Sequence, residues 1–279
     1  MATILLFGAS GPVGRFLLPL LTARQHVVPV SRTPAGADTG WLCADINDER
    51  VAWPAAESVI SLGPLDAFAA WLERRGDAAP RRILALSSMS AEAKRDSIDA
   101  AERALAERLR DAEARVLACA AGLGGAATLF RPTLIYGAGT DRSLAPIARF
   151  ARRYRILPVP IGARGLRQPV HARDLAKACL AALDAPATYG KVYELGGGER
   201  LRFDALLKRL AQAMPGPILR APVPLAALRL MARLHPAGGI ARAAITRLRE
   251  PLVADNSAAQ RDFGYQPGAF DAQSVLPDG

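Results

Sequence analysis

Short apolar runs alternate with longer amphipathic stretches over the first half of the chain. The runs end at glycine, serine, arginine or aspartate, and they predict buried strands at 4–7, 27–30, 41–44, 59–60, 82–86 and 128–130. Helices are predicted at 13–24 and 99–121, the second with Leu105, Leu109, Val116 and Leu117 facing inward. Short buried strands that alternate with helices are typical of an α/β fold, a Rossmann-type doubly wound parallel sheet covered on both faces.

The pattern changes after about residue 137. Prolines and glycines become frequent, and further helices are predicted at 172–184, 203–213 and 225–234. We therefore expect residues 1–137 to form the Rossmann domain. Residues 138–279 are expected to form a smaller C-terminal lobe that is interleaved with the first domain and not independent of it.

A glycine-rich turn links the first strand to the first helix. Its sequence is Gly8-Ala-Ser-Gly11-Pro-Val-Gly14. Glycine permits the tight turn, the close approach of a diphosphate to the backbone and the packing of helix on strand. The helix N-terminus offers free N–H groups to an anion. The turn therefore predicts a dinucleotide site that uses Gly8, Ser10, Gly11, Pro12, Val13 and Gly14; the alternative is a tight turn without a ligand.

The end of the second strand predicts which dinucleotide binds. NAD sites place an acidic residue there for the ribose hydroxyls, whereas this chain has Ser31-Arg32-Thr33. A guanidinium suits a 2′-phosphate, so Arg32 predicts NADP over NAD. Asp45 and Ile46 end the next strand, where they can hold adenine or simply cap a turn. Further cofactor contacts are expected from the strand ends, at Leu62, Gly63, Ser87, Arg131 and Pro132.

Composition limits the remaining classes of protein. Apolar residues make up 51% and aromatic residues 6%, so we expect a core of Ala, Leu, Val and Ile. The net charge is +10, and 32 of the 36 basic residues are arginines spread along the chain, which argues against nucleic acid as a partner. The basic stretch 225–249 could lie on an anionic membrane, but its proline and glycines favour short helices with solvated arginines.

The cysteines and histidines exclude other kinds of site. Three cysteines and three histidines are widely separated, which indicates no disulfide scaffold and no metal site. The chain shows neither a signal-peptide pattern nor an apolar run long enough to cross a bilayer. We expect a cytoplasmic protein with a small-molecule substrate and no integral membrane segment.

Several motifs occur in the order of a known family. They are the glycine turn, Leu86-Ser87-Ser88, Arg131-Pro132-Thr133-Leu134-Ile135-Tyr136-Gly137, Arg167-Gln168-Pro169-Val170-His171, Tyr193-Glu194-Leu195-Gly196-Gly197 and Phe263-Gly264-Tyr265-Gln266-Pro267. Together they resemble the extended and atypical short-chain dehydrogenase/reductase superfamily, the NAD(P)-dependent epimerase/dehydratase-like proteins. The resemblance implies hydride transfer at a nicotinamide. It also implies substrate contacts at Tyr136, Arg167 and His171.

The catalytic dyad of that family is missing. Its tyrosine and lysine, four residues apart, correspond by spacing to Leu105 and Leu109, and no tyrosine of this chain has lysine four residues later. Ser88 stands at the family's serine position. Lys94, in the loop after that strand, could approach a substrate or be a solvated loop lysine. Two hypotheses follow: an NADP(H)-dependent oxidoreductase or epimerase-like enzyme with a substitute acid, or a non-catalytic NADP(H)-binding redox sensor or assembly protein.

Overall fold

The computed structural model describes residues 3–33, 40–137, 139, 141, 143–227 and 247–276. The chain forms two compact units, and it passes between them repeatedly. Unit 1 comprises Met1–Pro132, Ala172–Leu195 and Asp255–Gln266, and unit 2 comprises Thr133–His171, Gly196–Ala254 and Pro267–Gly279. In place of one division after residue 137, two later segments of the chain return to complete unit 1.

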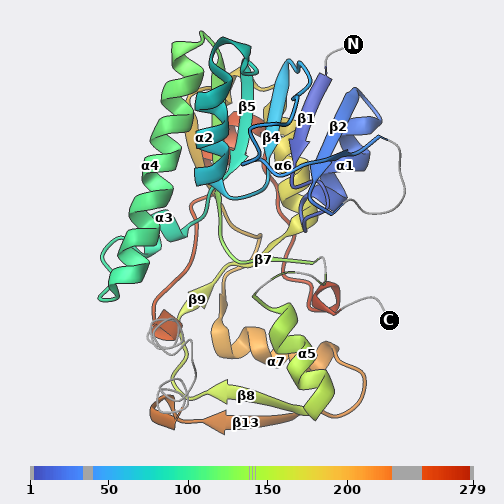
Figure 1. The fold of residues 1–279 in the computed structure, drawn as a ribbon. Coiled ribbons are helices and arrows are strands. Elements are labelled where there is room, and N and C mark those ends of the chain that lie inside the picture. Colours follow the sequence, from blue (N-terminus) through green and yellow to red (C-terminus); the bar gives the residue numbers. More distant parts are fainter. Residues whose placement is uncertain are drawn as a thin grey trace. The chain divides into compact units, whose positions relative to one another are not determined.

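Unit 1 is built on a parallel sheet of seven strands with helices on both faces (Figure 1). The strand order is β11-β6-β5-β4-β1-β2-β3. The strands are β1 (Thr3–Phe7), β2 (His26–Ser31), β3 (Leu42–Cys43), β4 (Ser58–Ser61), β5 (Arg82–Leu86), β6 (Ala126–Pro132) and β11 (Lys191–Leu195). The helices are α1 (Gly14–Thr22), α2 (Leu65–Arg75), α3 (Ser90–Ala93), α4 (Ala100–Gly122), α6 (Ala172–Leu183) and α10 (Ser257–Phe263), with 3-10 turns at Gly76–Ala78 and Pro186–Thr188. The predicted doubly wound fold is confirmed.

The buried core consists mostly of Ala, Leu, Val and Ile, as expected, and a cluster of aromatic residues lies within it in unit 1. Phe7, Trp53, Phe68 and Trp71 pack together where α2 covers the sheet, and the rings of Phe7 and Trp71 have centroids 4.9 Å apart. These four rings meet because β1, α2 and the segment before β4 come together at this face.

Helix α4 is turned differently from the prediction. Its buried positions are Glu102, Ala106, Ala112, Glu113, Val116 and Ala120, whereas Leu105, Leu109 and Leu117 are only half-buried. Small alanines let the helix lie close to its neighbours, and the leucines cover the flanks of the contact. Periodicity located the helix correctly and predicted the burial of Val116, but the predicted burial of Leu105, Leu109 and Leu117 was wrong, because these three are only half-buried.

The described residues of unit 2 form short strands and the helices α5 and α7. Its elements are β7 (Ile135–Tyr136), α5 (Ala145–Tyr154), β8 (Ile156–Pro160), β9 (Leu166–Arg167), β10 (Val170–His171), β12 (Leu201–Arg202), α7 (Phe203–Ala213) and β13 (Leu219–Val223), with 3-10 turns at Arg247–Arg249 and Gln273–Val275. Its core joins Leu157 of β8 to Ala148 of α5 and Leu206 of α7. Most of the predicted helix 225–234 and of the basic stretch 225–249 lies outside the described residues.

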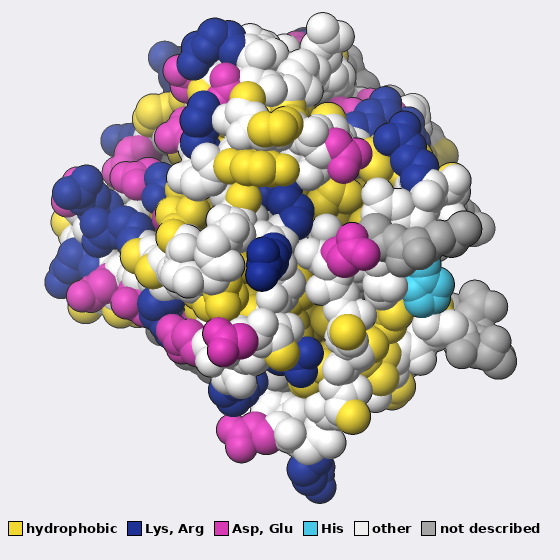
Figure 2. All heavy atoms as spheres, turned by 90° about the horizontal axis from the view of Figure 1, so that it is seen from above, with side chains coloured by type: hydrophobic (Ala, Val, Ile, Leu, Met, Phe, Trp, Pro, Cys, Tyr) yellow, Lys and Arg dark blue, Asp and Glu magenta, His cyan; other side chains and the backbone are white. Residues whose placement is uncertain are grey.

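Charged side chains are mixed on the surface that Figure 2 shows. Lysine and arginine side chains lie among aspartate and glutamate side chains, and they do not merge into one basic patch on this face. No helix in the described ranges combines the length and apolar character that a membrane span requires.

Candidate functional site

A cavity of about 290 Å³ opens at the carboxyl ends of β1, β2 and β4. These three strands are neighbours in the sheet, and the chain order reverses between β1 and β4. Open α/β sheets bind ligands at this kind of position. Seven of the predicted cofactor residues line the cavity, namely Gly8, Ser10, Gly11, Arg32, Asp45, Ile46 and Gly63.

The backbone of the glycine turn has no space for side chains. Gly8 has φ +75°, and a Cβ on Gly14 would lie 2.4 Å from the carbonyl oxygens of Gly8 and Ala9. The Gly11 N–H donates to the Gly8 oxygen at 2.9 Å, which closes the turn directly before α1. The first turn of α1 carries no acidic residue that would repel an anion. The turn is therefore a cradle of backbone that fits a diphosphate.

A pair of serines fastens the glycine turn to the end of β2. The hydroxyls of Ser10 and Ser31 lie 2.7 Å apart, and the Ser31 hydroxyl also accepts from the Thr33 N–H at 3.2 Å. In the sequence, Ser31 stands out only as a residue that is not acidic at a position where NAD sites carry an acid. Its hydroxyl holds the turn that presents Arg32, and a hydroxyl at the end of β2 beside a Ser-containing glycine turn is the signal that could have found it.

Arg32 and Asp45 stand at the rim of the cavity. The Arg32 side chain is 79% exposed, and its Nη1 lies 3.9 Å from Asp45 Oδ2. The other carboxylate oxygen of Asp45 accepts from the Asn47 N–H at 2.9 Å and from its side-chain amide at 3.1 Å, so Asp45 caps a turn. An exposed ion pair of this length contributes little energy, and a phosphate could replace the carboxylate beside the guanidinium.

The remaining residues of the predicted loop support the cavity wall. Val13 and Gly14 are buried under the turn, Pro12 lies within it, and the Cβ of Leu62 faces Gly8. The cavity has further polar lining that the sequence analysis did not assign, from Ser31, Thr33, Asn47 and Ser61.

Ser87 and Arg131 belong to a different, closed cluster. The Ser87 hydroxyl donates to Glu113 Oε1, and Arg131 donates to both carboxylate oxygens of Glu113, with Nε 2.8 Å from Oε1. Arg131 also donates from Nη1 to Glu92 at 2.7 Å. Hydrogen bonding to Glu113 raises the pKa of Arg131 above its ordinary value. The neighbouring Pro132 is buried, and its carbonyl accepts from the Met89 N–H at 3.1 Å. None of these three predicted residues lines the cavity.

The two predicted catalytic residues also have protein partners. Ser88 Oγ accepts from the Ser90 N–H at 3.1 Å, which caps the start of α3. The Lys94 ammonium lies 3.6 Å from the buried carboxylate of Glu102. Leu105 and Leu109, at the positions where sequence spacing predicts the family's dyad, are half-buried on α4.

The three predicted substrate residues are buried within unit 2. The Tyr136 ring packs edge-on against His171, with centroids 5.1 Å apart, and its hydroxyl accepts from the Asp271 N–H at 3.0 Å. Arg167 donates from Nη1 to the carbonyl oxygens of Leu166 and Glu250, at 2.8 and 2.6 Å. These contacts assign the three side chains a packing role in this structure, and their contact with a substrate stays a prediction.

Solved structures share this fold over almost the whole chain. A short-chain dehydrogenase/reductase superfamily protein from Agrobacterium tumefaciens with bound NAD superposes with a TM-score of 0.71, at 16% identity over 98% of this chain and 94% of its own. This chain has the short-chain dehydrogenase/reductase fold. A second structure of that fold, RMD from Pseudomonas aeruginosa complexed with NADPH, gives a TM-score of 0.66 at 17% identity, over 99% and 97% of the two chains.

Sequence relatives with known names match only part of the chain. UDP-glucose 4-epimerase of Vibrio cholerae is 24% identical over 159 residues, which are 56% of this chain and 47% of the epimerase. The mitochondrial NADH dehydrogenase [ubiquinone] 1 alpha subcomplex subunit 9 of Arabidopsis thaliana is 43% identical over 72 residues, 25% of this chain and 18% of that protein. The aligned part thus spans less than half the length of these relatives. No protein-family model matches the chain.

Proposed function

We propose that this chain binds NADP(H) at the cavity of unit 1 and uses it as an oxidoreductase or epimerase-like enzyme on a small carbonyl or sugar-nucleotide-like substrate. The observation that carries the proposal is the exposed guanidinium of Arg32 at the rim of a cavity floored by the glycine turn. Chains of the same fold have been solved with NAD and with NADPH, which supports a nicotinamide cofactor and leaves the choice to local chemistry.

In this proposal, different residues of the cavity bind different parts of the dinucleotide. The amides of the glycine turn and the N-terminus of α1 face the diphosphate, and Arg32 takes the 2′-phosphate through charge-assisted hydrogen bonds. Ile46 and Asp45 line the same cavity, which supports their contact with the adenine in this proposal. A bound nicotinamide supplies or accepts hydride, which is the chemistry that the fold otherwise lacks.

The cofactor preference is tested by titrating NADPH and NADH into wild type and Arg32→Ala. We expect wild type to bind NADPH more tightly, and the substitution to weaken NADPH by about 1–3 kcal/mol while NADH changes little, since only NADPH carries the 2′-phosphate. Arg24→Ala, which removes an exposed arginine that does not line the cavity, is the matched control. Equal affinity of wild type for both cofactors would overturn the assignment of Arg32.

Ser88 is the candidate for the group that polarises a substrate carbonyl. Its oxygen accepts from the Ser90 N–H, and among the described residues no acceptor takes its hydroxyl proton. The hydroxyl can therefore donate to a substrate oxygen. If the chain is an enzyme, Ser88→Ala should slow NADPH oxidation about 10²-fold with cofactor affinity unchanged, as for the loss of one positioned hydrogen-bonding group. Activity equal to wild type would remove Ser88 from the reaction.

A second candidate function is non-catalytic NADP(H) binding, as a redox sensor or as a subunit of a larger assembly. It is supported by the ion pair that holds Lys94, by the leucines at the positions of the dyad, and by the 43% identity to a segment of a protein named as an NADH dehydrogenase subunit. Stopped-flow absorbance of NADPH with a panel of carbonyl compounds and UDP-sugars separates the two. Tight NADPH binding with no turnover on any member of the panel favours the second function, and catalysed hydride transfer rejects it.

A further inference from the structure

A two-stranded ribbon in unit 2 has one apolar face. β8 and β13 run in parallel side by side (Figure 1). Their register pairs Ile156 with Leu219, Pro158 with Ala221 and Pro160 with Val223. Side chains alternate between the faces of a strand, so these six apolar residues share one face. The opposite face packs Leu157 into the core with α5 and α7, whereas Leu219 is 65% exposed and Ile156 39% exposed.

Helix α5 leads into the exposed end of this ribbon and carries exposed aromatic side chains in its last two turns. The helix ends at Tyr154 and continues through Arg155 directly into β8. Phe150 and Tyr154 are both exposed, and their rings pack with centroids 4.8 Å apart. Arg155 is also the partner of β13, because its carbonyl accepts from the Leu219 N–H at 2.9 Å. The end of α5 and the start of the ribbon therefore form one surface.

The two chain segments that form this surface contain arginines but no acidic residues. Residues 143–173 and 216–227 contain no aspartate or glutamate, while α5 and the residue after it supply Arg149, Arg152, Arg153 and Arg155. In the part of the chain that the structure describes, the ion pairs include neither Arg152 nor Arg153.

We propose that this α5–ribbon surface, formed by Phe150, Arg152, Arg153, Tyr154, Ile156 and Leu219, binds an anionic lipid bilayer. Aliphatic and aromatic side chains enter the boundary between headgroups and acyl chains, and arginines around them contact lipid phosphates. The surface suits nucleic acid less well, because Ile156 and Leu219 have no ring to stack on a base and the two aromatic rings pack on each other. The inference does not depend on the cofactor site.

Flotation of the full-length chain with vesicles tests the proposal. Vesicles of phosphatidylcholine mixed with phosphatidylglycerol should bind wild type at least about tenfold more tightly than vesicles of phosphatidylcholine alone, and added salt should weaken the binding. Arg152→Glu with Arg153→Glu should lower binding about tenfold or more. Ile156→Ser with Leu219→Ser should lower it by a similar factor by removing the inserted apolar groups.

Matched variants on unit 1 provide the controls. Arg24→Glu with Arg81→Glu makes the same change of charge at exposed positions, and Ile98→Ser removes the 88% exposed Ile98; both should bind as wild type does. All substituted side chains are exposed, and thermal unfolding verifies that each variant is folded. Equal binding to both kinds of vesicle, or an α5 charge variant that binds as wild type, would overturn the proposal. The proposal would also be overturned if the chain bound duplex DNA more tightly than anionic vesicles and if Ile156→Ser with Leu219→Ser did not weaken DNA binding. That result would assign the surface to nucleic acid.

Discussion

Two arginines of unit 1 were both predicted to contact the cofactor, and the structure gives them opposite surroundings. Arg32 is exposed at the cavity rim, with one carboxylate oxygen 3.9 Å away. Arg131 is held in a closed cluster by Glu113, Glu92 and, through Glu113, Ser87. Burying a charge is costly unless it is paired, so Arg131 is already committed to the fold. An arginine at a strand end is therefore not enough to predict a cofactor contact. Its guanidinium must also keep N–H donors that no group of the protein accepts.

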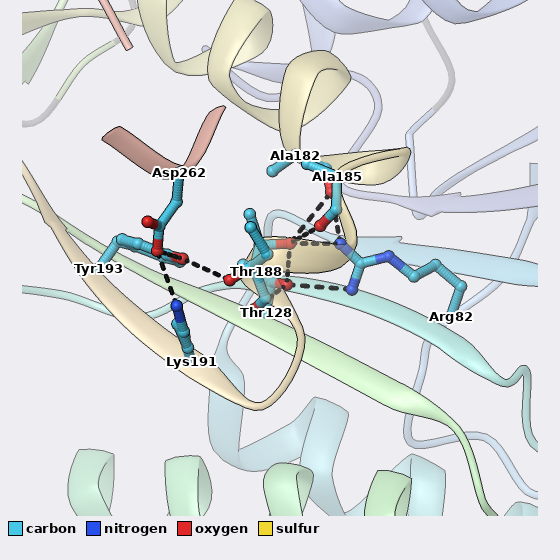
Figure 3. Close-up of polar contacts among 9 residues, drawn as sticks. Arg82, Thr128, Ala182, Ala185, Thr188, Lys191, Tyr193 and Asp262 are labelled. Atoms are coloured by element: carbon cyan, nitrogen blue, oxygen red, sulfur yellow. Dashed lines mark hydrogen bonds and ion pairs between the residues drawn. The ribbon is translucent and has the colours of Figure 1, made fainter. Parts of the chain in front are cut away.

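Arg82, at the other end of the sheet, is a second arginine whose donors are used by groups of the protein itself. Arg82 at the start of β5 donates to Ala182 and Leu183 carbonyls at the end of α6 and to the hydroxyls of Thr128 and Thr188 (Figure 3). Carbonyls at a helix C-terminus lack partners within the helix and carry partial negative charge, which favours a cation there. Arg82 thus fastens a returning segment of unit 1 to the sheet.

The largest expected effect is the loss of stability in Glu113→Ala, which alters the closed cluster of Arg131 and leaves the open cavity of Arg32 unchanged. Removing this carboxylate leaves Arg131 buried with only part of its pairing, so we expect a loss of about 3–5 kcal/mol in the free energy of unfolding, measured by urea denaturation. NADPH affinity of the folded fraction should hardly change.

A double variant provides the control for that loss. Glu113→Leu with Arg131→Met replaces the pair by apolar groups and should recover much of the stability, since no charge stays buried without a partner. A loss below about 1 kcal/mol for Glu113→Ala would show that the cluster is not a closed buried pair, because exposed pairs contribute that little.

An intermediate effect is expected at the cavity itself, from Gly14→Ala. The added Cβ would approach two backbone oxygens at 2.4 Å, so the turn must shift away from the shape that cradles a diphosphate. We expect NADPH affinity to fall by a factor of about ten or more, about 1.4 kcal/mol, measured by fluorescence titration. Gly40→Ala, at a glycine with no atom within 4 Å of an added Cβ, is the matched control. Undiminished affinity in Gly14→Ala would contradict a tightly fitted turn.

The smallest effect is a pH dependence in the polar group at the far end of the sheet. Hydrogen bonds from Lys191 and from Tyr193 lower the pKa of Asp262 below its ordinary value (Figure 3). A carboxyl with a lowered pKa in the folded state stabilises the fold above the unfolded value, about 4, and this contribution is lost as the pH falls through the folded value. Thermal unfolding should therefore separate wild type from Asp262→Asn at pH 7, and the difference should shrink below about pH 4. A difference that is constant with pH would exclude this role.

Local pattern predicted six of the seven strands of the main sheet, the helices α1, α4, α6 and α7, and the glycine turn, because each depends on residues close together in sequence. It did not predict the other described helices, among them α2, α5 and α10. The carboxyl-end cavity followed from the same pattern, since parallel strands end at one edge of the sheet. The partners of Arg131 and Lys94 were not predictable, because Glu113 and Glu102 reach them only after α4 packs against the sheet. The inward face of α4 failed for a related reason: alanine carries little hydrophobic signal in a sequence, yet it allows the closest packing.

The order in which the sheet is completed has a consequence for synthesis of the chain. β11 covers the outer edge of β6, but it lies some sixty residues later in the sequence, beyond a segment that belongs to unit 2. A nascent chain released by a ribosome at the end of β6 exposes unpaired N–H and C=O groups along that strand until residues 191–195 emerge. Truncation near residue 137 creates the same open edge permanently, so such a fragment is expected to self-associate, and the shortest part of this chain with a finished sheet extends at least to Leu195.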